Sequence, residues 1–272
     1  MWSDLERPPL HEGALRRALV TPAGPYAVLN VVATVPSTNI ALADAAWQGA
    51  PDRTVLVAEH QTAGRGRAVR SWVAPARSGL TLSVLLRPTE VPPARWGWIP
   101  LLVGVALCRT VSALGELPAV LKWPNDLLLG TGRRKAAGIL VEVVPGSAVV
   151  VGIGLNVTLR PDELPAPDAT SLAIEQAACT DRDPLLRGLL RALDSEVRVW
   201  CEHQGDPVAS GLRETYRQRC VTLGEQVRVE LPGQPTLTGT AVDLDTEGRL
   251  VVLSGGQRHA LSAGDVTHVR PA

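Results

Sequence analysis

The chain has 272 residues and no net charge, with 27 basic and 27 acidic side chains, and it is 45% hydrophobic and 20% charged. These numbers are typical of a globular protein with one large domain, or a medium domain and a small one, and they argue against broad electrostatic binding of nucleic acid. The four cysteines are widely spaced and form no disulfide framework, no apolar run is long enough to span a membrane, and the N-terminus lacks the pattern of a signal peptide, so a cytoplasmic location is predicted.

The first 30 residues are predicted to form an arm that contains a short helix over 12–20 and then a turn rich in proline and glycine. After this arm, Ser37, Thr38 and Asn39 directly precede the apolar residues 40–43. Serine or threonine in that place is a typical N-cap, so a helix is predicted to begin there.

A long irregular connection follows, between strands predicted over 54–59 and 80–86. A loop of about twenty residues inside a compact domain is usually functional or disordered. The next predicted elements are an apolar helix over 95–114, short strands over 120–123 and 126–129, a hairpin of strands over 137–144 and 148–157 that turns at Pro145 and Gly146, a proline-rich loop over 162–168, and an amphipathic helix over 184–202.

The character of the sequence changes beyond Tyr216. Residues 225–269 show short alternating strands separated by Pro-Gly, Glu-Gly and Gly-Gly pairs, which predicts a small all-β unit of roughly fifty residues. The predicted organisation is therefore an arm over 1–30, a main domain over 31–220 and a C-terminal domain over 221–272.

The irregular connection carries a local concentration of positive charge. Residues 60–89 contain no acid but five arginines, namely Arg65, Arg67, Arg70, Arg77 and Arg87. Guanidinium forks suit phosphate and carboxylate oxygens, and the interspersed Gly64 and Gly66 let backbone N–H groups approach a ligand. The alternative is a solvated basic loop, but Trp72 adds a flat face on which a purine could stack, and this combination favours a nucleotide site.

A second segment, Lys122-Trp123-Pro124-Asn125-Asp126, places a cation, an amide and a carboxylate at one turn. Asn125 and Asp126 could serve only to form the turn, which such residues do well. In the functional interpretation, Asp126 would bind Mg²⁺ together with phosphate oxygens and Lys122 would neutralise phosphate charge.

Two further segments lie on predicted strands. Lys135 begins an apolar strand and is either a lysine that extends to solvent or a point charge for a ligand carboxylate or phosphate, with Gly138 leaving room for that ligand. Gly152 and Gly154 precede Asn156 at the end of another strand, but no third glycine and no helix follow, so the Rossmann fingerprint is absent. The sequence also has no P-loop, no GxSxG elbow and no zinc-ligand spacing.

Taken in order, these segments resemble the motifs of the biotin protein ligases. The five matching motifs are Ser37-Thr38-Asn39, Gln61 to Arg67 with Trp72, Lys122 to Asp126, Lys135 to Leu140, and Gly152 to Asn156. The resemblance covers about residues 30–160 and continues into the C-terminal β unit. One position departs from the pattern, because Val69 stands where the family loop usually has a third glycine, and this puts the geometry of the loop in doubt.

The resemblance implies an α+β fold, a mixed sheet flanked by helices like that of class II aminoacyl-tRNA synthetases, followed by a small SH3-like β-barrel. It also implies an ATP-dependent ligase that forms biotinyl-5′-AMP and transfers biotin to a lysine of a biotin carboxyl carrier domain of an acyl-CoA or pyruvate carboxylase. The arm is too short for the DNA-binding winged helix of the repressor members, so no DNA partner is expected, and the oligomeric state stays open.

The resemblance also implies roles for single residues. Lys135, Arg67 and Arg70 would be catalytic. Biotin would contact Ser37, Thr38, Asn39, Gln61, Gly64, Arg65, Gly66, Arg67, Lys135 and Gly138. ATP would contact Arg67, Arg70, Trp72, Lys122, Asn125, Asp126, Asn156 and Arg270, with Mg²⁺ on Asp126. The arginine loop would close over the reactive anhydride as a lid.

Three other functions remain open at this stage. Lipoate ligases and octanoyl transferases share the implied fold, and a competition between biotin and lipoate would separate them. A DNA-binding regulator with biotinyl-AMP as corepressor would shift DNA in a gel. A small-ligand binding protein without catalysis would release no pyrophosphate.

Overall fold

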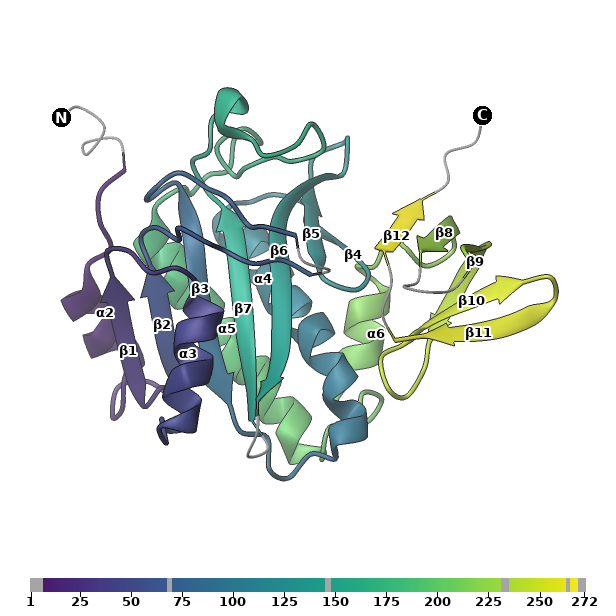
Figure 1. The fold of residues 1–272 in the computed structure, drawn as a ribbon, viewed down its shortest axis with the longest axis horizontal. Helices are drawn as coiled ribbons and strands as arrows, with labels where there is room; N and C mark the ends of the chain where they lie inside the picture. The colour runs from purple at the N-terminus through teal and green to yellow at the C-terminus, as the bar shows by residue number, and fades with distance from the viewer. Residues whose placement is uncertain (1–6, 68–69, 145–147, 231–234, 263–264, 269–272) are drawn as a thin grey trace.

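A seven-stranded mixed sheet forms the centre of the main domain, with strand order β1-β2-β3-β7-β6-β5-β4 (Figure 1). The computed structural model describes residues 7–67, 70–144, 148–230, 235–262 and 265–268. The strands are β1 (Val28–Val32), β2 (Thr54–Ala58), β3 (Gly79–Leu86), β4 (Val120–Lys122), β5 (Asp126–Leu129), β6 (Arg134–Val144) and β7 (Ala148–Asn156). Only the β1–β2 pair is parallel, so the predicted mixed sheet is confirmed.

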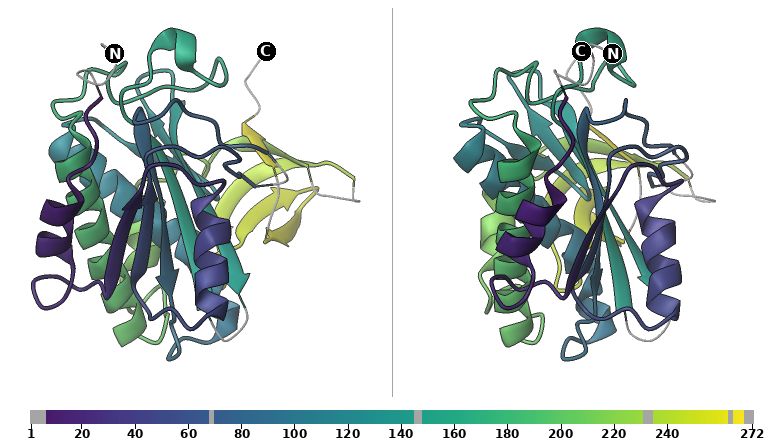
Figure 2. Two further views of the ribbon diagram at one scale, coloured as in Figure 1. Left: turned by 60° about the vertical axis from the view of Figure 1, so that its left-hand side comes forward. Right: turned by 90° about the vertical axis from the view of Figure 1, so that its left-hand side faces the viewer.

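Helices cover both faces of this sheet (Figures 1 and 2). On one face lies α3 (Thr38–Trp47), whose Leu42 and Ala46 pack with Leu85 and Val150 of the central strands. On the other face lie α4 (Ile99–Leu114) and α5 (Arg182–Glu202), with α2 (Glu12–Leu19) beside α5. Because the central strands β3 and β7 are covered on both sides, every residue in them is buried, and they therefore lack a polar alternation.

The apolar stretch Pro93–Leu114 is long and hydrophobic enough to cross a membrane by composition alone, but 67% of its 18-residue apolar window is buried inside the protein. It consists of a 3₁₀ helix, η1 (Pro93–Trp98), followed by α4. Its burial against the sheet and α5 makes it a core helix.

The N-terminal segment is integrated into the main domain. β1 runs across residue 30 and pairs with β2, and α2 packs on both β1 and α5. The sequence analysis missed β1, whose strand pattern is weak because Asn30 interrupts four valine and leucine residues. α2 protects the outer edge of β1, since Arg16 Nε donates to Leu29 O at 2.6 Å and Val31 N donates to Glu12 Oε1 at 3.1 Å.

Some smaller features of the structure differ from the predicted elements. α6 (Leu212–Arg217) and the 3₁₀ helix η2 (Pro161–Glu163) had not been predicted. α3 begins at Thr38 as expected, but the Ser37 side chain makes no capping hydrogen bond. β6 and β7 pair up to Val144 and Ala148, as predicted for a hairpin, while the turn at Pro145 and Gly146 lies outside the described residues.

The C-terminal unit is a five-stranded antiparallel sheet with the order β11-β10-β9-β8-β12. Its strands are β8 (Gln226–Glu230), β9 (Leu237–Leu244), β10 (Leu250–Ser254), β11 (Gln257–Leu261) and β12 (Asp265–His268). The all-β prediction is confirmed, but the expected barrel is not closed, because β11 and β12 stand at opposite ends of the strand order in the described part of the chain. The Glu-Gly and Gly-Gly pairs form the turns on either side of β10.

Candidate active site

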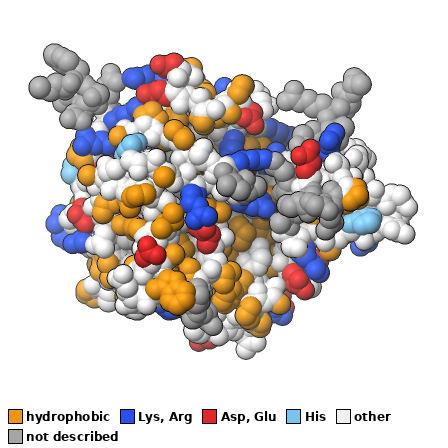
Figure 3. All heavy atoms as spheres, viewed as in Figure 1, with side chains coloured by type: hydrophobic (Ala, Val, Ile, Leu, Met, Phe, Trp, Pro, Cys, Tyr) orange, Lys and Arg blue, Asp and Glu red, His pale blue; other side chains and the backbone are white. Residues whose placement is uncertain are grey.

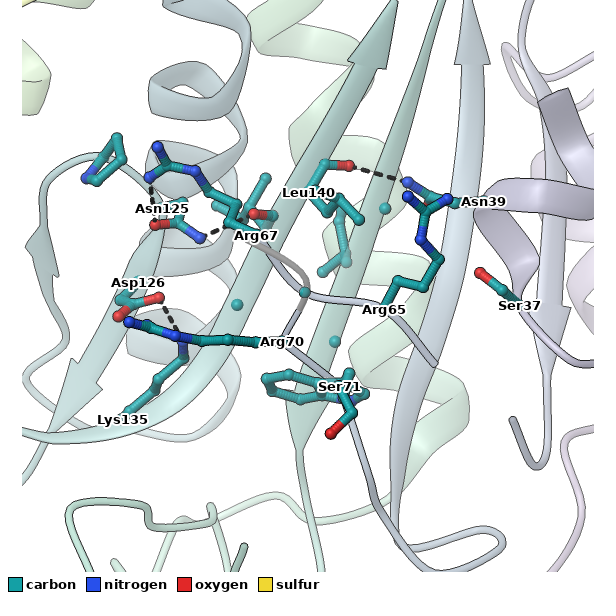
Figure 4. A pocket seen from close by; sticks show the side chains of 18 of the residues that line it. Ser37, Asn39, Arg65, Arg67, Arg70, Ser71, Asn125, Asp126, Lys135 and Leu140 are labelled. Carbon is teal, nitrogen blue, oxygen red and sulfur yellow. Dashed lines mark hydrogen bonds and ion pairs between the residues drawn. The ribbon is translucent and has the colours of Figure 1, made fainter. Parts of the chain in front are cut away.

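A cavity of about 390 Å³ lies on the α3 side of the sheet, where strands β3, β6 and β7 form its floor (Figure 4). The start of α3, the arginine loop, the turn between β4 and β5, and the C-terminal sheet form its walls. On this face of the molecule, basic side chains gather in the middle and toward the C-terminal unit (Figure 3).

Glycines shape the floor of the cavity. Gly138 and Gly154 lie opposite each other in β6 and β7, and the ring of Trp72 rests on this pair. A Cβ on Gly154 would lie 2.3 Å from the Trp72 ring, and one on Gly152 would lie 2.2 Å from Asn39 Oδ1. Glycine is therefore required at both β7 positions so that loop and helix side chains can lie against the sheet.

The arginine loop folds back on itself over this floor. Trp72 N donates to Gly64 O at 2.9 Å and Gly66 N donates to Arg70 O at 2.6 Å. A Cβ on Gly64 would lie 2.3 Å from Trp72 O, which explains the glycine there. Val69, where the family pattern has a glycine, lies outside the described residues.

A chain of polar contacts joins the loop to α3 and β3 at one end of the cavity. Gln61 Oε1 accepts from the backbone N–H of Thr38 at 2.7 Å and from its hydroxyl at 3.0 Å. The buried Ser83 hydroxyl lies 2.7 Å from Thr38 Oγ1 and 2.6 Å from Asn39 Oδ1. These contacts fix donors and acceptors on three elements, which suits recognition of a neutral polar group.

Glu142 of β6 links the same end of the cavity to the loop. Its carboxylate accepts from Asn39 Nδ2 at 2.8 Å and pairs with Arg65 Nη1 at 3.2 Å. Asn39 Nδ2 also donates to Leu140 O at 3.2 Å, as Figure 4 shows. The sequence analysis gave Glu142 no role, because nothing along the chain places it beside Arg65.

Positive charge is concentrated at the opposite end. Lys135 Nζ lies 2.6 Å from Asp126 Oδ1, Arg67 Nη1 donates to Asn125 Oδ1 at 3.2 Å, and Arg70 points toward the Asp126–Lys135 pair (Figure 4). Burial lowers the pKa of Lys122 and of Arg67, while the charge of Asp126 opposes both shifts. Cations held in so confined a space favour an anionic ligand that would restore their lost hydration.

The two lysines of this cluster are also the only lysines of the protein. Of 27 basic residues, only Lys122 and Lys135 are not arginine, and both line the cavity. A composition so biased toward arginine makes these positions informative, because an ammonium is a compact point charge that can lose its proton, whereas a guanidinium is a permanently charged planar fork.

Most of the predicted site residues meet in this one cavity. Its lining includes Ser37, Thr38, Asn39, Gln61, Arg65, Gly66, Arg67, Arg70, Trp72, Lys122, Asn125, Asp126, Lys135 and Gly138. Gly64 shapes the loop without lining the cavity, and Arg270 lies outside the described residues. Asn156 is buried away from the lining, where its Nδ2 donates to Thr170 O at 2.9 Å.

Several further lining residues had been given no site role of their own, although most of them lie within the matching motifs. They are Ser71, Leu82, Trp123, Pro124, Ile139, Leu140, Gly152, Ile153, Gly154, Glu230 and Val266. Gly152 and Gly154 had been part of a matching family motif and had been rejected as a dinucleotide fingerprint, but neither had been given a site role; their alternation on one strand face was the available signal. Glu230 and Val266 come from the C-terminal sheet, and no local pattern predicts that they reach this cavity.

The fold and the site define a class that the comparisons with known proteins also identify. Residues 31–157 match the Biotin/lipoate A/B protein ligase family, and residues 222–269 match the Biotin protein ligase C terminal domain. The chain is thus built from a catalytic domain of the biotin and lipoate ligase class and the C-terminal domain found with biotin ligases.

Individual relatives narrow this class. The biotin–acetyl-CoA-carboxylase ligase of Mycobacterium tuberculosis is 45% identical over 98% of both chains. The bifunctional ligase/repressor BirA of Escherichia coli is 29% identical over 90% of this chain and 74% of its own length. A solved structure of the Aquifex aeolicus biotin protein ligase in complex with biotin and ATP superposes with a TM-score of 0.74 at 28% identity, covering 90% of this chain and 100% of that one. The chain belongs to the biotin protein ligase family.

Proposed function

We propose that this protein uses ATP to activate biotin as biotinyl-5′-AMP and then transfers biotin to a lysine of a biotin carboxyl carrier domain. Its similarity to biotin ligases over nearly the whole chain supports the reaction class. The observation that carries the proposal is the shared cavity, in which a polar end beside Gln61 and Thr38 faces a cationic end beside Lys122 and Lys135.

In the first step, a carboxylate oxygen of biotin attacks the α-phosphorus of ATP. A bond from this oxygen to phosphorus forms, the bond from phosphorus to the bridging oxygen breaks, and pyrophosphate leaves with the electron pair. Both reactants are anions and repel each other, so the cations of the cavity contribute by lowering this repulsion and by holding the reactants in line. Arg67, Arg70 and Lys122 would face the phosphates, and Lys135 would face the carboxylate and then the anhydride.

In the second step, the neutral amine of the acceptor lysine attacks the biotinyl carbonyl. An amide bond forms, the bond to the phosphate oxygen breaks, AMP leaves, and the amine gives up a proton. The anhydride hydrolyses in water, so the fold of the arginine loop over the cavity supports its proposed role as a lid.

The remaining roles follow the two ends of the cavity. Ser37, Thr38, Gln61 and Arg65 would bind the ureido end of biotin, and Asn39 would brace this end, because its amide is bonded to Leu140 and Glu142. Trp72 would stack near adenine, and its buried Nε1 has no hydrogen-bond partner among the described residues. The buried amide of Asn156 instead holds the 170 segment, so we omit it from the nucleotide site.

Magnesium fits this site only together with the nucleotide. The described residues contain no cluster of three metal-ligating side chains, and Asp126 is the carboxylate beside the proposed phosphate position. Mg²⁺ commonly binds through one or two carboxylates and substrate phosphates. When bound it would neutralise phosphate charge, with Asp126 as its protein ligand. We further propose that the enzyme acts in the cytoplasm on a carboxylase subunit.

The test is release of pyrophosphate by the purified protein with ATP and either biotin or lipoate. We expect release with biotin and little with lipoate, followed by biotin transfer to a carrier domain. Release with lipoate alone would replace the proposed substrate, and absence of release with either acid would leave only a binding function. A gel shift with DNA in the presence of biotin and ATP checks the expected absence of DNA binding.

Lys135→Ala tests the role of the lysine nearest the reacting carboxylate. We expect pyrophosphate release to fall by roughly 10²–10³-fold, because a positioned charge on the developing transition state is lost. The fold should persist, since Lys135 is partly exposed and β6 stays paired with β5 and β7. Stopped-flow pyrophosphate detection and circular dichroism measure the two effects, and wild-type release rates would refute this role.

A further inference from the structure

The turn between β9 and β10 of the C-terminal sheet is clasped by two tryptophans of the main domain. Trp98 Nε1 donates to Thr246 O at 3.0 Å, and Trp123 Nε1 donates to Gly248 O at 3.1 Å. Both indoles are almost completely buried. Thr246 and Gly248 thus each give a backbone carbonyl to a buried donor more than a hundred residues away, and loss of either bond would leave a buried carbonyl without its donor.

The backbones of η1 and of the β9–β10 turn are also in close contact at this junction. A Cβ on Gly97 would lie 2.2 Å from Glu247 O, and one on Gly248, which has a φ of +81°, would lie 2.9 Å from Gly97 O. The turn is also rigid by itself, because Asp245 Oδ1 accepts from Glu247 N and Arg249 N, each at 2.9 Å. A preformed turn therefore fits against η1 with no space for a side chain at either glycine.

The clasped side chain Trp123 belongs to the segment that carries Lys122, Asn125 and Asp126. The chain that enters the C-terminal unit holds this segment from its other side, since Leu121 N donates to Arg219 O at 2.8 Å and Trp123 N donates to Thr222 Oγ1 at 3.0 Å. The cationic end of the cavity is thus positioned by two separate pieces of the C-terminal region.

We propose that the β9–β10 turn is a positioning element for catalysis, which sets the place of Lys122 and Asp126 through Trp98 and Trp123. Trp98 does not line the cavity and acts only through the turn. The inference rests on the proposed function for its kinetic consequences, because the Lys122–Asp126 segment is assigned to the nucleotide. It predicts that loosening the clasp impairs ATP use and leaves biotin binding at the Gln61 end unchanged.

Trp98→Phe is the main variant, because it keeps an aromatic ring and removes the donor to Thr246. Trp96→Phe is the matched control, since Trp96 lies in the same η1 helix and its Nε1 donates at 3.1 Å to Val91 O, a local acceptor outside the C-terminal unit. We expect Trp98→Phe to lower kcat/KM for ATP in pyrophosphate release by roughly tenfold, as small displacements of catalytic groups do. The dissociation constant for biotin should match that of the wild type, and Trp96→Phe should match the wild type in both measurements.

Gly97→Ala is the second variant, because it pushes the turn away while retaining both tryptophan donors. We expect the same loss of kcat/KM for ATP with unchanged biotin affinity. If both variants keep wild-type kcat/KM, or if biotin affinity falls in parallel with it, the positioning role is wrong and the junction is only structural.

An activity-independent measurement separates this inference from the proposed function. Lys122 and Lys135 are the only lysines, so acetylation by acetic anhydride followed by peptide mass mapping reports each one individually. In Trp98→Phe, Lys122 should be acetylated several-fold faster than in the wild type, whereas in Trp96→Phe it should react at the wild-type rate. Equal Lys122 rates in Trp98→Phe and the wild type would overturn the clasp even if the enzyme released no pyrophosphate.

Discussion

Lys122 and Lys135 are the only lysines of the chain, so their positions are informative about the site. Arginine serves at every other basic position, including the three that line the same cavity, Arg65, Arg67 and Arg70. Charge alone would be supplied equally well by arginine. The two lysines therefore indicate that these positions need a compact ammonium group. Because burial lowers the pKa of Lys122, we also expect its charge to depend on pH in the alkaline range.

Lys122→Arg tests that consequence through pH. Burial lowers the pKa of Lys122 below the ordinary 10.5, so its charge is lost at a lower pH than usual as pH rises. If that charge faces the phosphates, pyrophosphate release should decline on the alkaline side below pH 10.5. Arginine keeps its charge there, so the variant should be slower at pH 7.5 but should retain its own maximal rate to higher pH.

A pH–rate profile of pyrophosphate release at saturating ATP measures this difference between the wild type and Lys122→Arg. Circular dichroism at each pH checks that both proteins stay folded. An alkaline decline that is identical in the two proteins would assign it to another group, such as the acceptor or the nucleotide.

At the scale of elements, the loop between β2 and β3 is joined to the sheet by a few contacts rather than by a continuous ladder. In the arginine run, the backbone bonds of the described residues 64–67 and 70–72 are internal, and Glu142 on β6 provides an ion pair to Arg65. Because both partners are partly exposed, this pair is worth at most about 1 kcal/mol. Such a weak link is suitable for the lid proposed above.

Glu142→Gln is expected to loosen the loop. The glutamine carbonyl can still accept from Asn39, so the change mainly removes the charge that attracts Arg65. Tryptic cleavage after the loop arginines should become about two- to fivefold faster, which corresponds to roughly 0.5–1 kcal/mol. Glu202→Gln is the control, because it breaks an exposed pair with Arg198 far from the loop. If both variants are cleaved at the wild-type rate, Glu142 does not restrain the loop.

At the scale of the whole molecule, one buried ion pair joins the start of α5 to the end of β2 and to the N-terminal segment. Arg182 at the start of α5 pairs with Glu59 at 2.5 Å and donates to Pro8 O at 2.6 Å, while Glu59 Oε1 accepts from Leu10 N at 2.6 Å. The side chains of Arg182 and Glu59 are 6% and 9% exposed. This contact holds the N-terminal segment against the end of β2, two residues before Gln61 enters the cavity.

Arg182→Ala should therefore lower the free energy of unfolding by about 3–5 kcal/mol, because it leaves the Glu59 carboxylate buried and unpaired. Arg198→Ala, which breaks an exposed pair on the same helix, should cost less than about 1 kcal/mol. Urea unfolding followed by tryptophan fluorescence measures both. Equal losses in the two variants would mean that the buried pair has no special part in stability.

Helices and strands with a strong local hydrophobic pattern were predicted correctly from the sequence, whereas those with a weak pattern were not. The amphipathic leucines of α5 and the β-branched runs of β6 and β7 were found within two or three residues of their ends. β1 was missed because its pairing with β2 and its protection by α2, rather than its own composition, make it a strand. α6 has only six residues, too few for a periodic signal.

By itself, the sequence determined the chemistry available to the protein: an arginine loop with Trp72, the Lys122–Asp126 turn, and glycines on a strand, each defined by neighbours in the chain. Only the tertiary structure decided which of these act together. It placed the Asn156 amide against Thr170, outside the cavity lining, gave Glu142 a partner in Arg65, and brought Trp98 to Thr246. These outcomes depend on contacts between distant segments, whose geometry is set by packing of the whole chain and leaves no trace in local residue spacing.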